Sequence, residues 1–112
     1  MLDKYWILKD KKVIEVNDVL EWGRFFKKTK ERIVKQETLP SGYWVSTVFL
    51  GIDHNFELSG SPLLFETMVF SEKEGKKDEV DMERYATYEE AEKGHEKMVN
   101  KYKNETSRHY RS

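Results

Sequence analysis

The sequence predicts an α+β fold, in which an antiparallel β-sheet of about five to six strands carries two helices packed on one face. Residues 43–52 and 63–70 are rich in β-branched and aromatic side chains and contain one charge between them, which is typical of central strands. Residues 17–30 and 87–103 instead repeat apolar side chains every three or four positions, which is the spacing of an amphipathic helix.

The first third of the chain is expected to begin with a hairpin. Its strands are residues 5–8 and 13–16, and residues 9–12 form the charged turn between them. Asn17 is the predicted cap of the first helix, because its side chain can accept a backbone N–H of the first turn. A third strand is expected over residues 32–39, since β-branched residues there lead into a Pro-Ser-Gly turn.

Two loops and an edge strand are expected after the first central strand. Asp, Asn, Ser, Gly and Pro dominate residues 53–62, which predicts a loop between the central strands. Residues 71–78 read as a second, charged loop, and residues 80–86 as a last, edge-like strand. Thr87 and Glu90 then have the spacing of a capping box, in which each side chain satisfies a backbone N–H at the start of a helix.

Composition limits the class of protein and its partners. The chain has 112 residues with no cysteine, 20 basic and 21 acidic side chains, and no apolar run long enough to span a membrane. The missing cysteines exclude a disulfide framework and fit a reducing cytoplasm, where we expect the protein to be. The near-zero net charge gives no strong nucleic-acid signal. We expect one domain over residues 1–103 and a disordered basic tail over 104–112.

Three polar residues follow the first central strand and form the first candidate site. Asp53, His54 and Asn55 offer a carboxylate, an imidazole and an amide within one turn. Loops held by a rigid sheet often carry function, so the group could contact a ligand. The alternative is that Asp53 and Asn55 only stabilise the turn through their side chains.

Two further candidates are ionisable residues inside apolar segments. Glu66 lies in the middle of the second central strand, where an unpaired carboxylate would cost several kcal/mol, so it needs a partner such as Arg84 or a polar pocket. His95 lies on the apolar face of the last helix, beside Gly94, which can let a backbone or a ligand come close. The alternatives are a structural ion pair for Glu66 and a hydrogen-bonded core histidine for His95.

A basic run in the first half of the chain is the fourth candidate. It consists of Arg24, Lys27, Lys28, Lys30, Arg32 and Lys35. Cations suit the C-terminal end of a helix, so a solvated face is one interpretation. The other is an anion- or phosphate-binding patch, because aromatic residues nearby could stack on a nucleotide base.

The predicted ligand pocket combines these candidates. We expect Asp53, His54, Asn55, Glu66, Arg84 and His95 to bind a small polar ligand, for example a nucleotide. No phosphate-binding glycine loop, nucleophile elbow or zinc-protease motif is present. A metal could use Asp53, His54, Glu66 and His95, but their spacing matches no metal motif, so we expect no metal and no cofactor. Nothing in the sequence is positive evidence for an enzyme.

The central strands also carry a resemblance to known proteins. The matching segments are residues 44–56 (WVSTVFLGIDHNF), 62–70 (PLLFETMVF) and 84–95 (RYAT, then EA and GH). They resemble a family of small uncharacterised proteins from phage and prophage genomes, over about half of the chain. The resemblance implies a phage or prophage setting and no particular reaction.

Three functions remain open at this point. The resemblance implies an accessory protein that binds a host protein or sequesters a nucleotide signal, and so counters host defence. A metal-dependent or hydrolytic enzyme would use Asp53, His54, Glu66 and His95. A structural or assembly protein would pair the exposed edges of the hairpin or of residues 80–86 between copies, and a homo-oligomer fits the first and the third function alike.

Overall fold

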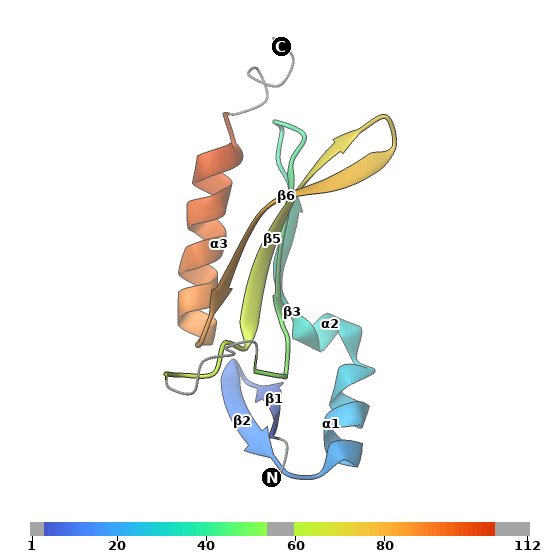
Figure 1. Ribbon diagram of the computed structural model, residues 1–112, viewed down its shortest axis with the longest axis vertical. Helices are drawn as coiled ribbons and strands as arrows, with labels where there is room; N and C mark the ends of the chain where they lie inside the picture. Colours follow the sequence, from blue (N-terminus) through green and yellow to red (C-terminus); the bar gives the residue numbers. More distant parts are fainter. Residues whose placement is uncertain (1–3, 54–59, 105–112) are drawn as a thin grey trace.

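The strands form two separate antiparallel sheets in the computed structural model, which describes residues 4–53 and 60–104. The smaller sheet is the hairpin of β1 (Tyr5–Lys9) and β2 (Lys12–Val16). The larger sheet has the strand order β3, β4, β5 and β6, which span Ile33–Thr38, Trp44–Phe49, Phe65–Lys73 and Lys76–Tyr85. In Figure 1 the hairpin lies below one end of this larger sheet. The predicted α+β class is confirmed.

β4 and β5 are the two inner strands of the larger sheet, as their apolar sequences predicted. Their register places Val45 opposite Val69 and Thr47 opposite Thr67. The predicted number of strands was too high, because the larger sheet has four strands rather than five or six. The hairpin stays outside it and docks on the segment after β4, where the Trp6 N–H donates to the carbonyl of Gly51 at 3.1 Å.

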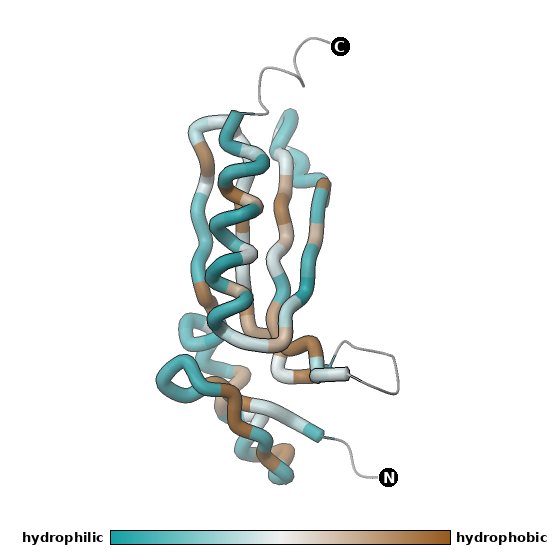
Figure 2. The backbone as a smooth tube through the Cα atoms, turned by 90° about the vertical axis from the view of Figure 1, so that its left-hand side faces the viewer, coloured by the Kyte–Doolittle hydropathy of each residue, from teal (hydrophilic) through white to brown (hydrophobic). Residues whose placement is uncertain are grey.

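Helix α3 (Tyr88–Tyr102) covers one face of the larger sheet, and in Figure 2 it stands in front of the strands. It begins at the predicted capping box. The Thr87 hydroxyl accepts the Glu90 N–H at 3.1 Å, and the Glu90 carboxylate accepts the Thr87 N–H at 3.1 Å. Ala91 and Met98 point from this helix into the core, where both are buried.

Helix α1 (Val19–Phe26) does not lie on the sheet, although we expected both helices there. It packs against the hairpin and is followed by the short helix α2 (Thr29–Arg32). A chain that leaves β2 directly into α1 keeps the helix beside the hairpin. Its apolar stripe reaches the sheet through Phe25, whose ring meets that of Phe49 edge to face with centroids 5.8 Å apart.

Two local predictions differ from the structure. Most of the predicted loop 71–78 is strand, because Glu74 and Gly75 both have positive φ (54° and 79°) and form a two-residue hairpin turn. Asp18, rather than Asn17, caps α1 and accepts a backbone N–H of the first turn at 2.9 Å. Residues 105–112 of the predicted tail lie outside the described part of the chain.

The chain has two regions with a shared core. We call residues 4–32 (β1, β2, α1 and α2) the N-terminal lobe, and residues 33–104 (β3–β6 and α3) the sheet body. One cluster of buried side chains crosses between them; its members are Trp6, Phe25, Phe49, Leu64, Phe65, Tyr85 and Ala91. The lobe is therefore anchored to the sheet body through Trp6 and Phe25.

Candidate functional site

Glu66 and Arg84 form the ion pair that the sequence offered as one interpretation. They lie opposite each other on β5 and β6, and the Arg84 Nε donates to a Glu66 carboxylate oxygen at 2.9 Å. Side chains alternate between the two faces of a strand, and the next residue, Thr67, points toward α3. Glu66 and Arg84 therefore lie on the uncovered face, whereas His95 reaches the sheet from the helix side. These three residues do not line one pocket.

Asp53 has a structural role in the loop between the central strands. Its carboxylate accepts the Leu63 N–H at 2.9 Å and so connects the two ends of that loop. The other two predicted loop residues, His54 and Asn55, lie outside the described residues. Of the six predicted ligand-binding residues, the described structure brings Glu66 and Arg84 together.

His95 is the centre of a buried polar network under α3. Its side chain is 1% exposed, and its Nδ1 lies 2.7 Å from the hydroxyl of Thr47. That hydroxyl is 2.5 Å from the hydroxyl of Thr67 on the adjacent strand. The His95 Nε2 lies 2.7 Å from a carboxylate oxygen of Glu37. Because the carboxylate can only accept, Nε2 carries the proton, and Thr47 can donate to Nδ1.

The network reaches the surface through two ion pairs. The Lys35 ammonium lies 3.5 Å from Glu37 and 3.0 Å from Glu96. The hydrogen bond from His95 lowers the pKa of Glu37, the positive charge of Lys35 adds to this effect, and burial opposes it. The chain of contacts joins α3 to β3, β4 and β5, so it fixes the helix on the sheet.

Gly94 explains how α3 can approach the sheet so closely. A Cβ at this position would overlap the Tyr85 ring and its hydroxyl. That hydroxyl is buried and has no partner of hydrogen-bonding geometry among the described residues, and burial raises the pKa of Tyr85. The nearby Thr67 hydroxyl partly opposes this rise. The predicted close approach at Gly94 is thus made by a tyrosine ring of the protein itself.

The order carboxylate, imidazole, hydroxyl in Glu37, His95 and Thr47 resembles that of a hydrolytic triad. Thr47 is completely buried, however, so no substrate can reach its hydroxyl in this arrangement. The ligand atoms of Glu37, His95 and Glu96 lie within 4.8 Å of one another, which is close enough for a metal ion. The Lys35 ammonium already contacts both carboxylates there and offsets part of their negative charge. The network is best explained as a structural one.

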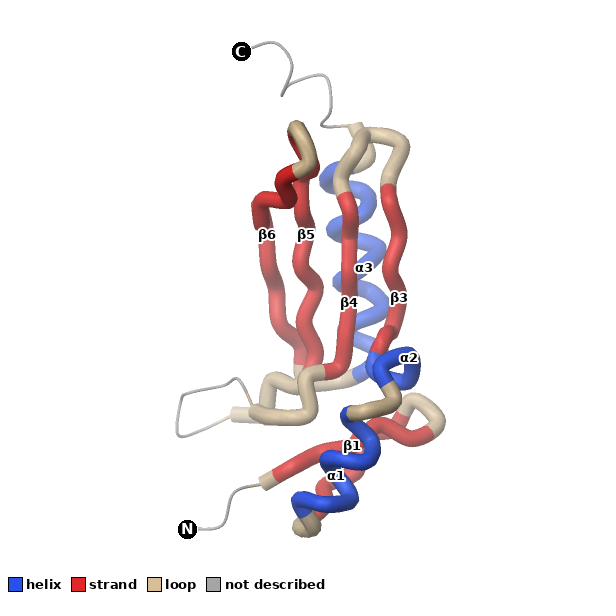
Figure 3. Tube along the Cα trace, turned by 90° about the vertical axis from the view of Figure 1, so that its right-hand side faces the viewer, coloured by secondary structure: helices blue, strands red, loops and turns tan. Residues whose placement is uncertain are grey.

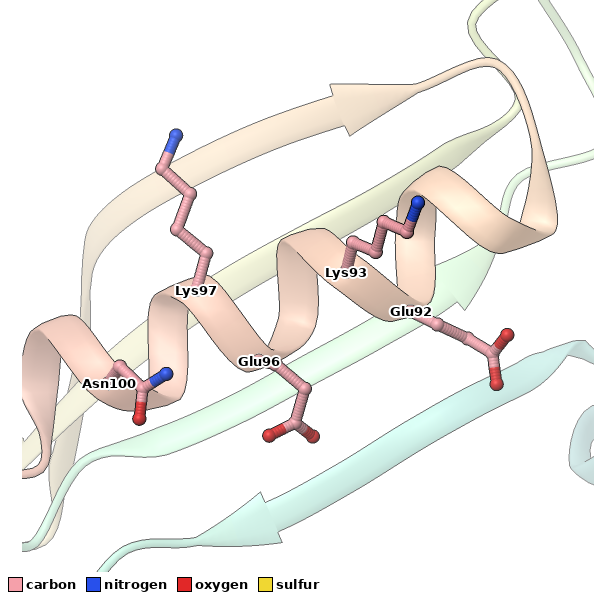
Figure 4. Close-up of a pocket in the computed structure, with 5 residues that line it drawn as sticks. All are labelled: Glu92, Lys93, Glu96, Lys97 and Asn100. Carbon is pink, nitrogen blue, oxygen red and sulfur yellow. The ribbon is translucent and has the colours of Figure 1, made fainter.

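The outer face of α3 carries a shallow depression between exposed side chains. Figure 4 shows its lining residues, which are Glu92, Lys93, Glu96, Lys97 and Asn100. The glutamates extend to one side of the helix and the lysines to the other. Glu96 reaches Lys35 on β3, and Lys97 reaches Glu83 on β6. All five residues come from one helix, so no second element closes the depression around a ligand.

The basic residues of the two regions differ in how they are neutralised. The N-terminal lobe carries nine basic and five acidic side chains, and residues 33–104 carry nine basic and 14 acidic ones. Among the described residues, none of the lobe's nine cations forms an ion pair. In the sheet body, five of the nine do, and these are Lys35, Arg84, Lys93, Lys97 and Lys101.

Three of the unpaired lobe cations line one groove of about 400 Å³. Lys9 and Lys11 come from the turn of the hairpin and Lys30 from α2. The other lining residues are Leu8, Asp10, Glu31, Ile33 and Tyr88. The Lys11 ammonium lies 5.7 Å from the centre of the Tyr88 ring. The groove therefore combines ammonium groups, one aromatic ring, two apolar side chains and two carboxylates.

The sequence pointed to this groove in part only. Lys30 belongs to the predicted basic run, but another member, Lys35, is used in the ion pairs of the sheet body. The sequence predicts a turn at Lys9 and Lys11 and places Tyr88 in the last helix. The local signal was the charged turn itself. Its approach to α2 and to the start of α3 is a long-range contact that no spacing predicts.

Comparison with known proteins identifies no relative of this chain. No family model matches the chain, and no curated protein or solved structure matches it either. The resemblance to phage and prophage proteins stays an expectation from the sequence. Within the described residues, no helix has both the length and the apolar character needed to cross a membrane.

Proposed function

We propose that this protein is a non-catalytic binding protein that holds a nucleotide in the groove between the hairpin turn, α2 and the start of α3. The observation that supports this most is the convergence of Lys9, Lys11 and Lys30 on one groove. No ion pair among the described residues neutralises these ammonium groups. Exposed cations of this kind are available to an anionic ligand.

The chemistry of the groove favours a nucleotide over a simple anion. The three lysines supply charge-assisted hydrogen bonds to phosphate oxygens. Tyr88, with the apolar side chains of Leu8 and Ile33, offers a surface on which a base can stack. The carboxylates of Asp10 and Glu31 repel a bare phosphate but can accept hydrogen bonds from the amino groups of a base. We therefore expect the protein to prefer a ligand that carries donors beside its phosphates.

The biological role within this proposal follows from the sequence resemblance alone. In a phage or prophage, a small non-catalytic protein that binds a nucleotide can sequester a signal of the host. Binding without turnover is sufficient for this purpose. The role as a phage accessory protein that counters host defence is therefore part of the proposal.

Thermal-shift and calorimetric titrations with mononucleotides and cyclic dinucleotides test the proposal, with inorganic phosphate and pyrophosphate as simple anions. A nucleotide present at 100 times its Kd should stabilise the folded state by about 2.7 kcal/mol. The variant Lys9→Gln/Lys11→Gln/Lys30→Gln should lose this effect while keeping its fold by circular dichroism.

The β5–β6 turn provides a matched control. Lys73 and Lys76 flank that two-residue turn as Lys9 and Lys12 flank the β1–β2 turn, and neither forms an ion pair among the described residues. Lys73→Gln/Lys76→Gln should bind the nucleotide like the wild type. The proposal fails if no nucleotide stabilises the protein, or if the control variant loses binding to the same extent as the groove variant.

A further inference from the structure

Two carboxylates line the groove beside its lysines. Asp10 comes from the turn between β1 and β2 and Glu31 from α2, and both side chains are exposed. In Figure 3 this turn lies close below α2. Among the described residues, neither carboxylate forms an ion pair. Two such carboxylates weaken a site for phosphate alone, so they indicate a ligand that also carries hydrogen-bond donors.

The turn between β1 and β2 holds a lysine where a glycine would be more stable. Asp10 and Lys11 both have positive φ, of 50° and 65°. Two-residue hairpin turns of this kind favour glycine at the second position, and the β5–β6 turn has Gly75 there, with a φ of 79°. A side chain disfavours this left-handed backbone. Keeping Lys11 at this position supports a role for its ammonium group in the groove.

Tyr88 gives the groove a fixed aromatic ring. The ring meets that of the buried Phe65 edge to face, with centroids 5.9 Å apart, and its side chain stays partly exposed. The exposed Lys11 ammonium, 5.7 Å from the ring centre, can move from the ring to a phosphate. A purine covers more of such a ring than a pyrimidine does, so stacking favours a purine.

The groove has room for one nucleotide. Its volume of about 400 Å³ lies toward the lower end of the about 300–1,000 Å³ that is usual for ligand pockets. This size suits one phosphate near the lysines and one base near Tyr88. It therefore favours a mononucleotide over a dinucleotide.

The bases differ in what their hydrogen-bonding edges offer a carboxylate, which has two oxygens and can only accept. Guanine presents two adjacent donors, its N1–H and its 2-amino group, and can bind both oxygens at once. Adenine and cytosine place an acceptor nitrogen beside their amino group, and uracil has carbonyl oxygens on both sides of its N–H. These acceptors repel the second carboxylate oxygen. Asp10 and Glu31 thus match guanine better than the other bases.

Building on the nucleotide-binding function proposed for the groove, we propose that its ligand is a guanine mononucleotide. The three lysines bind the phosphate and Tyr88 stacks on the base. The carboxylates of Asp10 and Glu31 accept the N1–H and the 2-amino group of guanine. The lysines thus supply attraction for any nucleotide, and the two carboxylates determine which base is preferred.

Calorimetric titration of the full chain with guanosine, inosine and adenosine 5′-monophosphates tests this preference. The three purines stack alike, so differences in Kd report the hydrogen bonds of the base edge. Inosine monophosphate lacks the 2-amino group and should bind about tenfold more weakly than guanosine monophosphate. Adenosine monophosphate has no pair of adjacent donors and should bind more weakly still.

The possible failures are distinguishable. If no nucleotide binds, the proposed function fails together with the guanine preference. If the three monophosphates bind equally, the groove binds nucleotides without reading the base, and the guanine preference alone is overturned. Equal binding of the three bases with weaker binding of the 2′-deoxy form would assign the carboxylates to the ribose and would also overturn it.

A double variant with a matched control tests the two carboxylates directly. Asp10→Asn/Glu31→Gln should bring the ratio of guanosine to adenosine monophosphate affinity close to one. It should not weaken pyrophosphate binding, because it removes two negative charges. In the control Glu74→Gln/Glu21→Gln, Glu74 has the turn position of Asp10 and Glu21 lies in the first turn of α1, as Glu31 does in α2. The control should keep the wild-type ratio. A groove variant that keeps the ratio, or a control that loses it, would overturn the proposal.

Discussion

The N-terminal lobe and the sheet body carry opposite charge and use their charged side chains differently. The lobe has a formal charge of +4, and residues 33–104 have −5. In the sheet body, charged residues attach α3 to the strands on both sides, through Glu96 to Lys35 and through Lys101 to Asp81. In the lobe, no described cation forms an ion pair.

This difference separates charges that hold the fold together from charges that are free to bind. A charged side chain in an ion pair network already has its partner, and exchanging that partner for a ligand gains little. An unpaired cation on the surface gives up only its contacts with water when it binds a ligand. The near-zero net charge of the whole chain hides this contrast, because the two regions almost cancel. Four sets of variants test this contrast between the two regions.

The largest effect is expected in the buried network of the sheet body. His95→Ala should lower the free energy of unfolding by about 3–5 kcal/mol, because it opens a cavity and removes the buried hydrogen bonds to Thr47 and Glu37. Urea denaturation at one fixed protein concentration measures it. Glu92→Ala, on the exposed face of the same helix, should change stability by less than about 0.5 kcal/mol. A loss below about 1 kcal/mol for His95→Ala would show that the network is not structural.

The second prediction compares two helical glycines, one in each region. Gly94→Ala should destabilise the protein by about 1–3 kcal/mol, because the added Cβ meets the Tyr85 ring. Gly23→Ala on α1 meets no atom within 4 Å and should stabilise by up to about 1 kcal/mol, as Ala is the better helix former. Thermal unfolding of both variants measures the sign of each change in stability relative to the wild type. A Gly94→Ala variant as stable as the wild type would mean that α3 can move away from the sheet without cost.

The sequence predicted the parts of the fold that depend on neighbouring residues. The capping box of Thr87 and Glu90 is a local signal, and it was confirmed. The inner position of β4 and β5 also follows from their composition. Most of the predicted loop 71–78 is strand, because a two-residue turn at Glu74 and Gly75 is enough to connect β5 with β6. The separation of the hairpin from the larger sheet depends on long-range pairing, which no local pattern specifies.

The candidate sites also divide into those that local sequence predicts and those that depend on long-range contacts. The pair of Glu66 and Arg84 could be predicted, because a charge inside an apolar strand requires a partner close by. The partners of His95 could not, since Glu37, Thr47 and Thr67 come from three different strands. Register decides which side chains meet under α3, and register is set by the whole sheet.

The third prediction concerns pH and should also separate the two regions. The pKa of Glu37 is lowered below its ordinary 4.5 chiefly by the hydrogen bond from His95, and that of Asp81 below 3.8 chiefly by the one from Lys101. A carboxylate with a lower pKa in the folded state binds fewer protons there than in the unfolded state. Its contribution to stability is therefore present above the ordinary pKa and is lost as the pH falls through the lowered one.

Urea midpoints between pH 7 and pH 3 measure this dependence. Glu37→Gln and Asp81→Asn should each be less stable than the wild type at pH 7 and should lose less stability on acidification. Glu15→Gln is the control from the lobe, because Glu15 forms no ion pair among the described residues; its profile should follow that of the wild type. Equal acid sensitivity in all three variants would contradict a special role of the sheet-body carboxylates.

The smallest effect is expected from single surface lysines, and its sign should differ between the regions. Lys9 and Lys12 lie directly opposite each other on β1 and β2, and like charges in this arrangement repel. Lys12→Gln should therefore stabilise the protein by about 0.2–0.5 kcal/mol at low salt. Lys101→Gln should destabilise it slightly, because it removes the 2.7 Å contact with Asp81.

Salt distinguishes these electrostatic effects from changes in packing. Charges on the surface are screened over about 10 Å at 0.1 M salt and about 3 Å at 1 M. The gain from Lys12→Gln should therefore disappear at 1 M sodium chloride, and the loss from Lys101→Gln should shrink. If Lys12→Gln destabilised the protein at low salt, the lobe cations would be part of the fold rather than free for a ligand. The contrast between the two regions would then have to be withdrawn.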